Sequence, residues 1–268
     1  MRPTPKPKTA DPVRGNAGVE AAYRKRLDRL IAEMNASTAY WLKAAWRETP
    51  PTHLAQDASA SAMLNLQRTM ARLGKKWLKR FDDLAPDVAA AFAKAATGHA
   101  ERAMMSVLDK AGFTVKFRPT VASMEGYRAV LGENVQLIKS IPAEYLADVQ
   151  QQVWASVRAG GDLATLSDGI EAKYGIARRR AEFIARDQNN KATAVVENVR
   201  RQQLGITEAI WVHSGGGKEP RPEHVKAGAD KLRFSLDKGA YLEGKWTLPG
   251  VEPNCRCTSR SIIPGLED

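Results

Sequence analysis

Apolar residues recur at helical spacing along most of the chain. In the first such segment, about residues 20–47, they stand three, four or seven positions apart, which predicts one apolar stripe on an amphipathic helix. Pro50 and Pro51 end this helix, because proline has no N–H and pushes its predecessor out of helical geometry. A second helix follows over about residues 55–81, with a heptad-like stripe. These stripes form either the protein's own core or a surface buried against a partner protein.

Prolines and glycines divide the next part of the chain into further expected helices. Pro86 suits the first position of a helix over about residues 86–110, and Pro142 opens another. Gly175 ends a short helix, and a long helix over about residues 177–204 is expected to bridge the two parts of the chain. Residues 113–117 alternate apolar and polar side chains, which predicts a short strand pairing with residues 209–213.

The pattern changes after Gly205, where glycine and proline become frequent and apolar runs become short. We therefore predict a fold that is mainly α with a small α+β C-terminal part: a helical N-terminal region, a long bridging helix and a short-stranded, turn-rich tail. The proline-rich residues 1–18 read as a disordered basic arm. The expected domains are a helical region over residues 19–134 and a C-terminal domain over residues 135–268.

Charge adds a candidate partner. The chain of 268 residues has 41 Lys+Arg against 30 Asp+Glu, a net charge of +11, and residues 1–80 hold most of the excess. Such a balance favours acidic partners, nucleic acid first. Three arginines near a helix start oppose the helix dipole, which favours an anionic partner there, although a solvated helix end explains them as well. The candidate nucleic-acid contacts are Lys6, Lys8, Arg14, Lys75, Lys76, Lys79, Arg80, Arg178, Arg179 and Arg180.

Several protein classes are not expected. The apolar runs fall short of the ~20 residues that a membrane helix needs, and the basic N-terminus has no apolar core of a secretory signal. No nucleophile elbow, phosphate-binding loop, dinucleotide fingerprint or HExxH motif occurs. We therefore expect a soluble intracellular protein that is a scaffold or binding protein, not an enzyme.

Two imidazoles and two thiols lie in the tail: His213, His224, Cys255 and Cys257. This is a complete ligand set for a structural zinc ion, the one cofactor that the residues suggest. The cysteines are separated by one residue, whereas zinc cysteines usually stand two to four residues apart; in a strand, however, both would point to one face. The alternative is two small buried thiols and two structural histidines. A disulfide between them would be strained across so short a loop.

The ordered residues of the tail resemble those of the phage Mu F-like minor head protein family, also called phage head morphogenesis proteins. The resemblance covers roughly residues 135–263. Many members have Thr-Glu where this chain has Asp187-Gln188. The matching residues are Ile184-Ala185-Arg186, Gly205, Trp211, Arg221, His224, Phe234, Pro249-Gly250 and Cys255-Arg256-Cys257.

The resemblance implies a minor head protein of a tailed phage or prophage. Such a protein would act in head morphogenesis near the portal, inside the capsid, with the portal and other head proteins as partners, after synthesis in the host cytoplasm. The basic residues would then contact packaged double-stranded DNA without sequence preference. Two alternatives stay open: a zinc-dependent DNA-processing enzyme, and a cellular DNA-binding protein.

Overall fold

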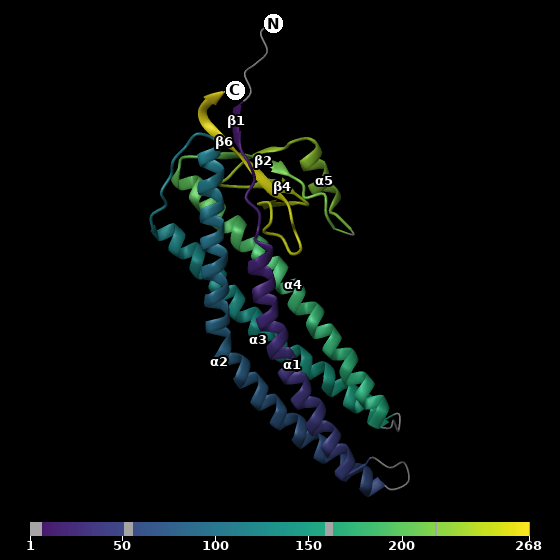
Figure 1. The fold of residues 1–268 in the computed structure, drawn as a ribbon. Helices are drawn as coiled ribbons and strands as arrows, with labels where there is room; N and C mark the ends of the chain where they lie inside the picture. The colour runs from purple at the N-terminus through teal and green to yellow at the C-terminus, as the bar shows by residue number, and fades with distance from the viewer. Residues whose placement is uncertain (1–6, 51–55, 159–162, 218, 268) are drawn as a thin grey trace. The chain divides into compact units, whose positions relative to one another are not determined.

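The structure is a computed structural model that describes residues 7–50, 56–158, 163–217 and 219–267. It confirms a mainly α fold with a small α+β C-terminal part (Figure 1). Within the described residues, none of the helices has an apolar stretch that would span a lipid bilayer. The long helices are α1 (Ala17–Glu48), α2 (Gln56–Lys110), α3 (Val121–Arg158) and α4 (Leu163–Gln203).

The chain forms two compact units that differ from the domains expected from sequence. Unit 1 combines residues 1–21, 90–132 and 185–268, and unit 2 combines residues 22–89 and 133–184. Each of the four long helices contributes one part to unit 1 and the other part to unit 2. The units are therefore assembled from separated stretches of sequence, which a division at single chain positions does not capture.

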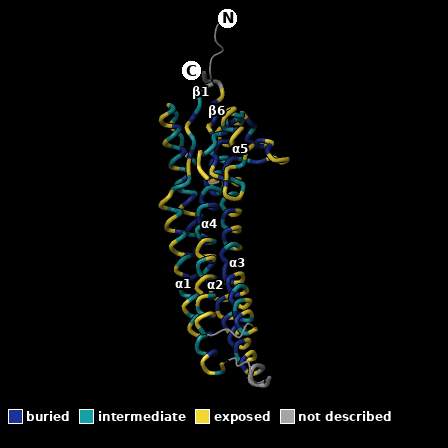
Figure 2. The backbone as a smooth tube through the Cα atoms, turned by 90° about the vertical axis from the view of Figure 1, so that its right-hand side faces the viewer, coloured by how far each residue is buried: buried dark blue, intermediate teal, exposed yellow. Residues whose placement is uncertain are grey.

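Unit 2 is built from helices whose apolar stripes bury one another. The dark blue positions in Figure 2 follow such stripes along the helices. Leu27, Leu73 and Ile138, from three different helices, have at most 1% of their surface exposed. Polar pairs lie among them: the Tyr23 hydroxyl donates to Asn134 Oδ1 at 2.9 Å. Most of the predicted stripes thus form the protein's own core.

The sequence prediction of separate helices was wrong at Pro86 and at Pro142, since α2 and α3 continue through them. A proline inside a helix costs about 3 kcal/mol. Phe81 and Ile141 lie near these prolines on buried stripes, and burying one such side chain contributes about 1.5–3 kcal/mol. Several buried residues in register therefore outweigh one proline. Gly175 likewise lies inside α4, where glycine costs only about 1 kcal/mol relative to alanine.

Unit 1 contains an antiparallel sheet with the strand order β1-β6-β2-β3. Strand β6 (Thr258–Glu267) pairs with β1 (Pro7–Ala10) on one side and with β2 (Glu208–Val212) on the other. Strand β3 (Arg233–Ser235) pairs with β2. A separate hairpin joins β4 (Ala240–Leu242) to β5 (Lys245–Thr247).

The N-terminal segment corrects the expectation of a disordered arm. Residues 1–6 lie outside the described residues, but residues 7–10 form β1 and α1 starts at Ala17. The edge of β6 offers unpaired backbone groups, which β1 satisfies. Between β1 and α1, Val13 is buried and its N–H donates to Glu197 Oε1 at 3.5 Å. The segment is held by backbone pairing and by two buried apolar side chains, Ala10 and Val13, which its composition does not reveal.

The predicted strand over residues 113–117 is absent from this part of the described chain. The expected alternation is nevertheless present, because Phe113, Val115 and Phe117 pack against the apolar core of unit 1. Pairing with residues 209–213 is excluded, since β2 already has β3 on one side and β6 on the other. The alternation predicted the buried face and not the hydrogen-bonding partner.

Candidate metal centre

Helix α5 (Pro222–Ala229) presents His224 to the core of unit 1. Its first position is a proline, which has a suitable φ and lacks an N–H that would have no helical partner. The His224 ring packs edge-to-face on Trp211 of β2, with ring centroids 5.0 Å apart and an interplanar angle of 77°. Only 3% of the His224 surface is exposed. Strand β2 and helix α5 therefore fix the imidazole in an apolar setting.

Cys255 and Cys257 stand in the turn-rich segment before β6. Gly250 and Asn254 have positive φ values of 84° and 60°, which fold this segment back on itself. The Gly250 N–H donates to Cys255 Sγ at 3.4 Å. Helix α4 holds the same segment, because Asp187 Oδ1 accepts from the Asn254 N–H at 2.6 Å. The loop backbone is thus fixed at both of its turns.

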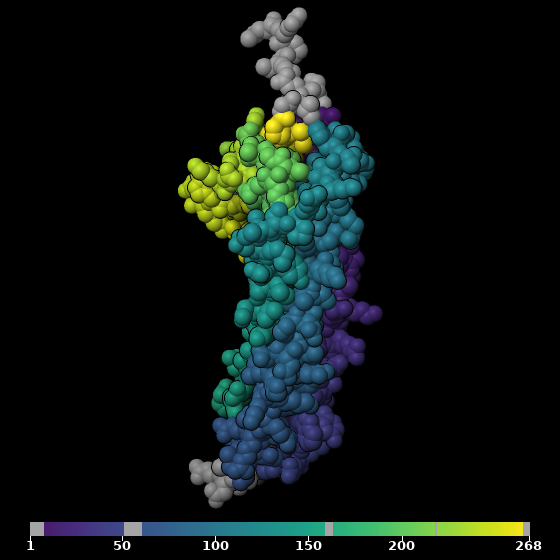
Figure 3. Space-filling view, turned by 90° about the vertical axis from the view of Figure 1, so that its left-hand side faces the viewer, coloured from purple at the N-terminus to yellow at the C-terminus, as the bar shows by residue number. Residues whose placement is uncertain are grey.

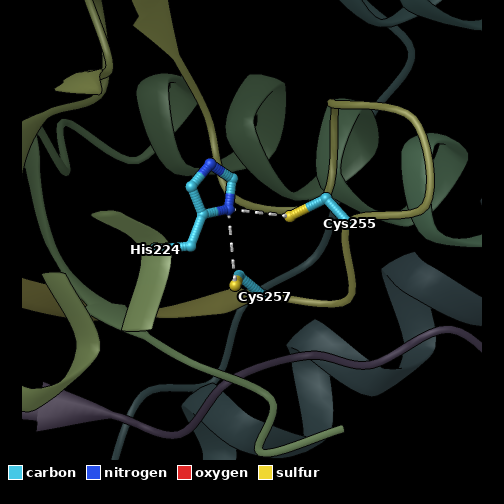
Figure 4. A group of neighbouring side chains, drawn as sticks. All are labelled: His224, Cys255 and Cys257. Atoms are coloured by element: carbon cyan, nitrogen blue, oxygen red, sulfur yellow. Dashed lines mark hydrogen bonds between the residues drawn. The ribbon is translucent and has the colours of Figure 1, made fainter. Parts of the chain in front are cut away.

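His224, Cys255 and Cys257 meet at one point (Figure 4). His224 Nδ1 lies 3.6 Å from Cys255 Sγ and 3.9 Å from Cys257 Sγ. All three ligand atoms lie within 4.8 Å of one another, and all three residues are buried. Within the described part of the chain, His224 Nε2 has no hydrogen-bond partner. The imidazole therefore points Nδ1 toward the two sulfurs, while Nε2 makes no hydrogen bond among the described residues.

The two thiols interact directly. A hydrogen bond with the Cys257 side chain lowers the pKa of Cys255 to about 5, and the same interaction raises the pKa of Cys257. Burial by itself raises the pKa of both thiols. The shared hydrogen bond thus makes Cys255 the more acidic of the two thiols.

His213, the fourth ligand predicted from sequence, does not belong to this group of ligand atoms. It follows β2, and its Nδ1 accepts a hydrogen bond from the Gly215 N–H at 3.2 Å. Helix α5 packs closely against it, because a Cβ at Gly228 would lie 2.4 Å from His213 Cβ. Three of the four predicted zinc ligands therefore lie together in the structure.

A cleft of about 620 Å³ reaches the three residues. His213, Arg186 and Arg221 also line it. Arg221 is tied down, since its Nη2 donates to the Pro253 carbonyl at 3.0 Å and its Nε lies 3.4 Å from Glu243 Oε2. The three buried residues thus border a cleft, and two arginines form part of the lining of that cleft.

The family described as Phage Mu protein F like protein matches residues 147–260. Residues 147–260 are similar to this family. The match confirms the resemblance to the Mu F-like family inferred from sequence.

A second comparison extends over more of the chain. An uncharacterized protein of Haemophilus influenzae strain Rd is 25% identical over 260 residues, which cover 96% of this chain and 56% of the relative. The chain thus spans about half the length of that relative. No solved structure matches the chain.

The residues that carry the resemblance to the Mu F-like family gather around the cluster. Trp211 stacks on His224 and also lies 6.0 Å from Phe234, ring centroid to ring centroid. Arg186 Nη2 donates to Asn254 Oδ1 at 3.4 Å. Most of the characteristic positions of the Mu F-like segment therefore build or support one place in unit 1.

Sequence reasoning missed two supporting residues on α4. Asp187, 5% exposed, accepts from the Asn254 N–H, and Asn190 Nδ2 donates to the Cys255 carbonyl at 3.3 Å. The signal that could have found them is the uninterrupted polar run at residues 187–190 within an otherwise amphipathic helix.

The predicted nucleic-acid contacts fall in both units, and Lys6 lies outside the described residues. In unit 1, Lys8 Nζ lies 5.9 Å from the centre of the Phe113 ring, and Arg14 is exposed. In unit 2, Lys75 and Arg80 are exposed on α2 and lie within ion-pair distance of no acidic group among the described residues.

Other basic residues of unit 2 are paired. Lys79 Nζ lies 3.0 Å from Asp83, Arg178 Nε lies 3.8 Å from Asp28, and Arg180 Nη2 lies 2.7 Å from Glu144. Lys76 Nζ donates to Ser37 Oγ at 3.3 Å. Arg179 is exposed and has no acidic neighbour within ion-pair distance in the described chain. Exposed pairs of this kind contribute only about 0–1 kcal/mol, so an incoming phosphate can replace them.

Proposed function

We propose that this chain is a minor head protein of a tailed phage or prophage that acts near the portal inside the capsid. The observation that carries the proposal is the Mu F-like match over residues 147–260. The net charge of +11 supports it, because a protein inside a filled head is surrounded by DNA phosphates. The host cytoplasm would be its location during assembly.

Contacts with packaged DNA would be made through phosphates and not through base edges. Lys75, Arg80 and Arg179 supply exposed positive charge on helical surfaces of unit 2. Part of α2 is open to solvent in the space-filling view (Figure 3, blue). Specific readout requires an element shaped for the major groove, and nothing in the sequence indicates one. Binding through phosphates alone is insensitive to sequence and falls with salt.

Contacts with the portal or another head protein would use exposed aromatic surface. Tyr40 and Trp41 of α1 are 65% and 40% exposed and pack edge-to-face, with ring centroids 5.2 Å apart. Arg72 of α2 lies over the Trp41 ring, 4.7 Å from its centre. Tyr, Trp and Arg are the residue types that contribute most at protein interfaces. This group is the part of unit 2 best suited to a protein partner.

The arrangement gives the zinc-dependent enzyme less support. A catalytic zinc requires an open coordination position and a general base within hydrogen-bond reach of the bound water. Three residues with access from a cleft would provide the first. For the second, no Asp or Glu of the described residues belongs to the ligand cluster, although Glu219 and His213 line the same cleft.

Mass spectrometry of purified particles tests the proposal. Particles of the phage that encodes the chain would be compared intact and after the DNA has been released. We expect the chain at low copy number beside the portal protein in intact particles. Loss of the chain when the DNA is released would further indicate that the chain leaves the capsid with the genome. Absence from both preparations would overturn the proposal and favour a cellular DNA-binding protein or an assembly factor.

A further inference from the structure

The group formed by His224, Cys255 and Cys257 is the strongest feature of the molecule that head morphogenesis does not explain. Two thiols and an imidazole converge from two separate segments, α5 and the loop before β6 (Figure 4). We propose that they bind one zinc ion through His224 Nδ1 and the two Sγ atoms. The ion would tie α5 to the loop, and a water molecule entering from the cleft would be the fourth ligand.

The spacing of the ligand atoms supports the proposal. Zinc–sulfur bonds of about 2.3 Å and zinc–nitrogen bonds of about 2.0–2.1 Å at tetrahedral angles place N and S about 3.6 Å apart. His224 Nδ1 lies 3.6 Å from Cys255 Sγ and 3.9 Å from Cys257 Sγ. Both N–S distances thus match a tetrahedral site, and the two sulfurs lie within 4.8 Å of one another.

The chemistry of the ligand set favours zinc over harder cations. Thiolates and imidazole select zinc and other soft or borderline metals, whereas Mg²⁺ and Ca²⁺ take oxygen ligands. Within the described residues the cluster contains no carboxylate. A site of two sulfurs and one nitrogen with a tetrahedral arrangement suits zinc.

The surrounding residues hold the ligands in place, as a preformed site requires. Trp211 packs against the imidazole, the Gly250 N–H donates to Cys255 Sγ, and Asn190 donates to the Cys255 carbonyl. These contacts come from β2, from the loop itself and from α4. Cysteines that only filled space would need neither an imidazole nitrogen pointing at both sulfurs nor a backbone N–H donating to Cys255 Sγ.

Metal analysis of the full chain, purified under reducing conditions without chelator, tests the assignment. We expect one zinc per chain, and less than a tenth of that in Cys255→Ser, Cys257→Ser and His224→Ala variants. His213→Ala is the matched control, because it removes a histidine that lines the same cleft, and it should keep its zinc. Loss of zinc from this control would overturn the three-residue assignment.

A second measurement on the unmodified chain covers the case in which the variants do not fold. After the zinc has been removed by a chelator, Co²⁺ should produce the absorption bands of a tetrahedral thiolate site, and zinc should displace it. Co²⁺ bands without thiolate-to-metal charge transfer, or no metal at all before and after loading, would overturn the proposal. Iron or copper bound in place of zinc would overturn the choice of metal.

Discussion

Arg201 and Glu197 form a buried ion pair in unit 1, with side-chain exposures of 3% and 7%. Arg201 also donates to Ser259 twice, to Oγ at 2.7 Å and to the carbonyl at 2.9 Å. Glu197 in turn accepts from the Val13 N–H. Two charged side chains of α4 thus connect β6 to the segment that follows β1. Burial raises the pKa of Glu197, and the Arg201 charge acts against this rise.

Replacing Arg201 by Met should therefore be costly and pH-dependent. Without Arg201, burial of Glu197 is uncompensated, and at pH 7 the variant should lose about 3–5 kcal/mol of unfolding free energy. The pKa of Glu197 in the folded state then lies further above its value in the unfolded chain. Folding favours the protonated form of Glu197. The stability that this form contributes is fully present below the unfolded pKa and is lost as the pH rises through the folded pKa.

Urea unfolding at pH 7 and pH 5 measures this effect, and we expect the deficit relative to the unmodified chain to be smaller at pH 5. The double variant Arg201→Met with Glu197→Leu is the control, because it removes both charges and should recover much of the loss. An equal deficit at both pH values would contradict the argument.

At the level of single residues, sequence could nominate site residues but not place them. His224, Cys255 and Cys257 were selected by their chemistry and meet in the structure. His213 was selected on the same ground and stands apart, because its position depends on the close packing of α5 against the end of β2. Whether the three bind zinc stays a prediction.

At the level of elements, periodicity located the helices, whereas prolines misled about their ends. Pro86 and Pro142 read as helix starts, yet the buried stripes on both sides stay in register through them. Residues 7–10 read as disordered because their composition is polar and proline-rich, but a strand is defined by its partner as much as by its own residues. Long-range pairing of this kind is not visible in local sequence.

Gly228→Ala tests the packing of α5 on β2. The new Cβ would lie 2.4 Å from His213 Cβ and 2.9 Å from its backbone nitrogen, so α5 must move. We expect a loss of about 1–3 kcal/mol in unfolding free energy, typical of overpacking. Gly74→Ala in α2 is the matched control, since nothing lies within 4 Å of its Cβ position. That change should stabilise by about 0.5–1 kcal/mol. Urea unfolding compares both; a neutral Gly228→Ala would contradict the close contact.

At the level of the whole molecule, the proposed zinc ligands and the three basic residues proposed to contact DNA on helical surfaces lie in different units. The zinc ligand candidates belong to unit 1, whereas Lys75, Arg80 and Arg179 belong to unit 2. The proposed metal site and the proposed DNA contacts can therefore be altered independently. A variant in one unit that changes both properties would indicate unfolding and not a loss of specific contacts.

The double variant Lys75→Ala and Arg80→Ala should weaken DNA binding equally on unrelated duplexes. Each phosphate contact contributes about 0.9 to the slope of log affinity against log salt, so the slope should fall in magnitude by about 2. Fluorescence anisotropy across a salt series measures it. Lys238→Ala, an exposed lysine in unit 1, is the control and should leave the slope unchanged. An unchanged slope in the double variant, or a strong preference for one duplex, would contradict nonspecific contact through α2.

The discontinuous make-up of unit 1 has a consequence during protein synthesis. All of unit 2 lies within residues 22–184, so the ribosome completes it before it starts the last stretch of unit 1, residues 185–268. At ~5–20 residues per second that stretch takes roughly 4–17 s. Meanwhile β1 has no β6 to pair with, and the buried faces of Met104 and Leu108 lack part of their core. The nascent chain thus exposes an unpaired strand edge and apolar surface until β6 emerges, a state that is prone to aggregation.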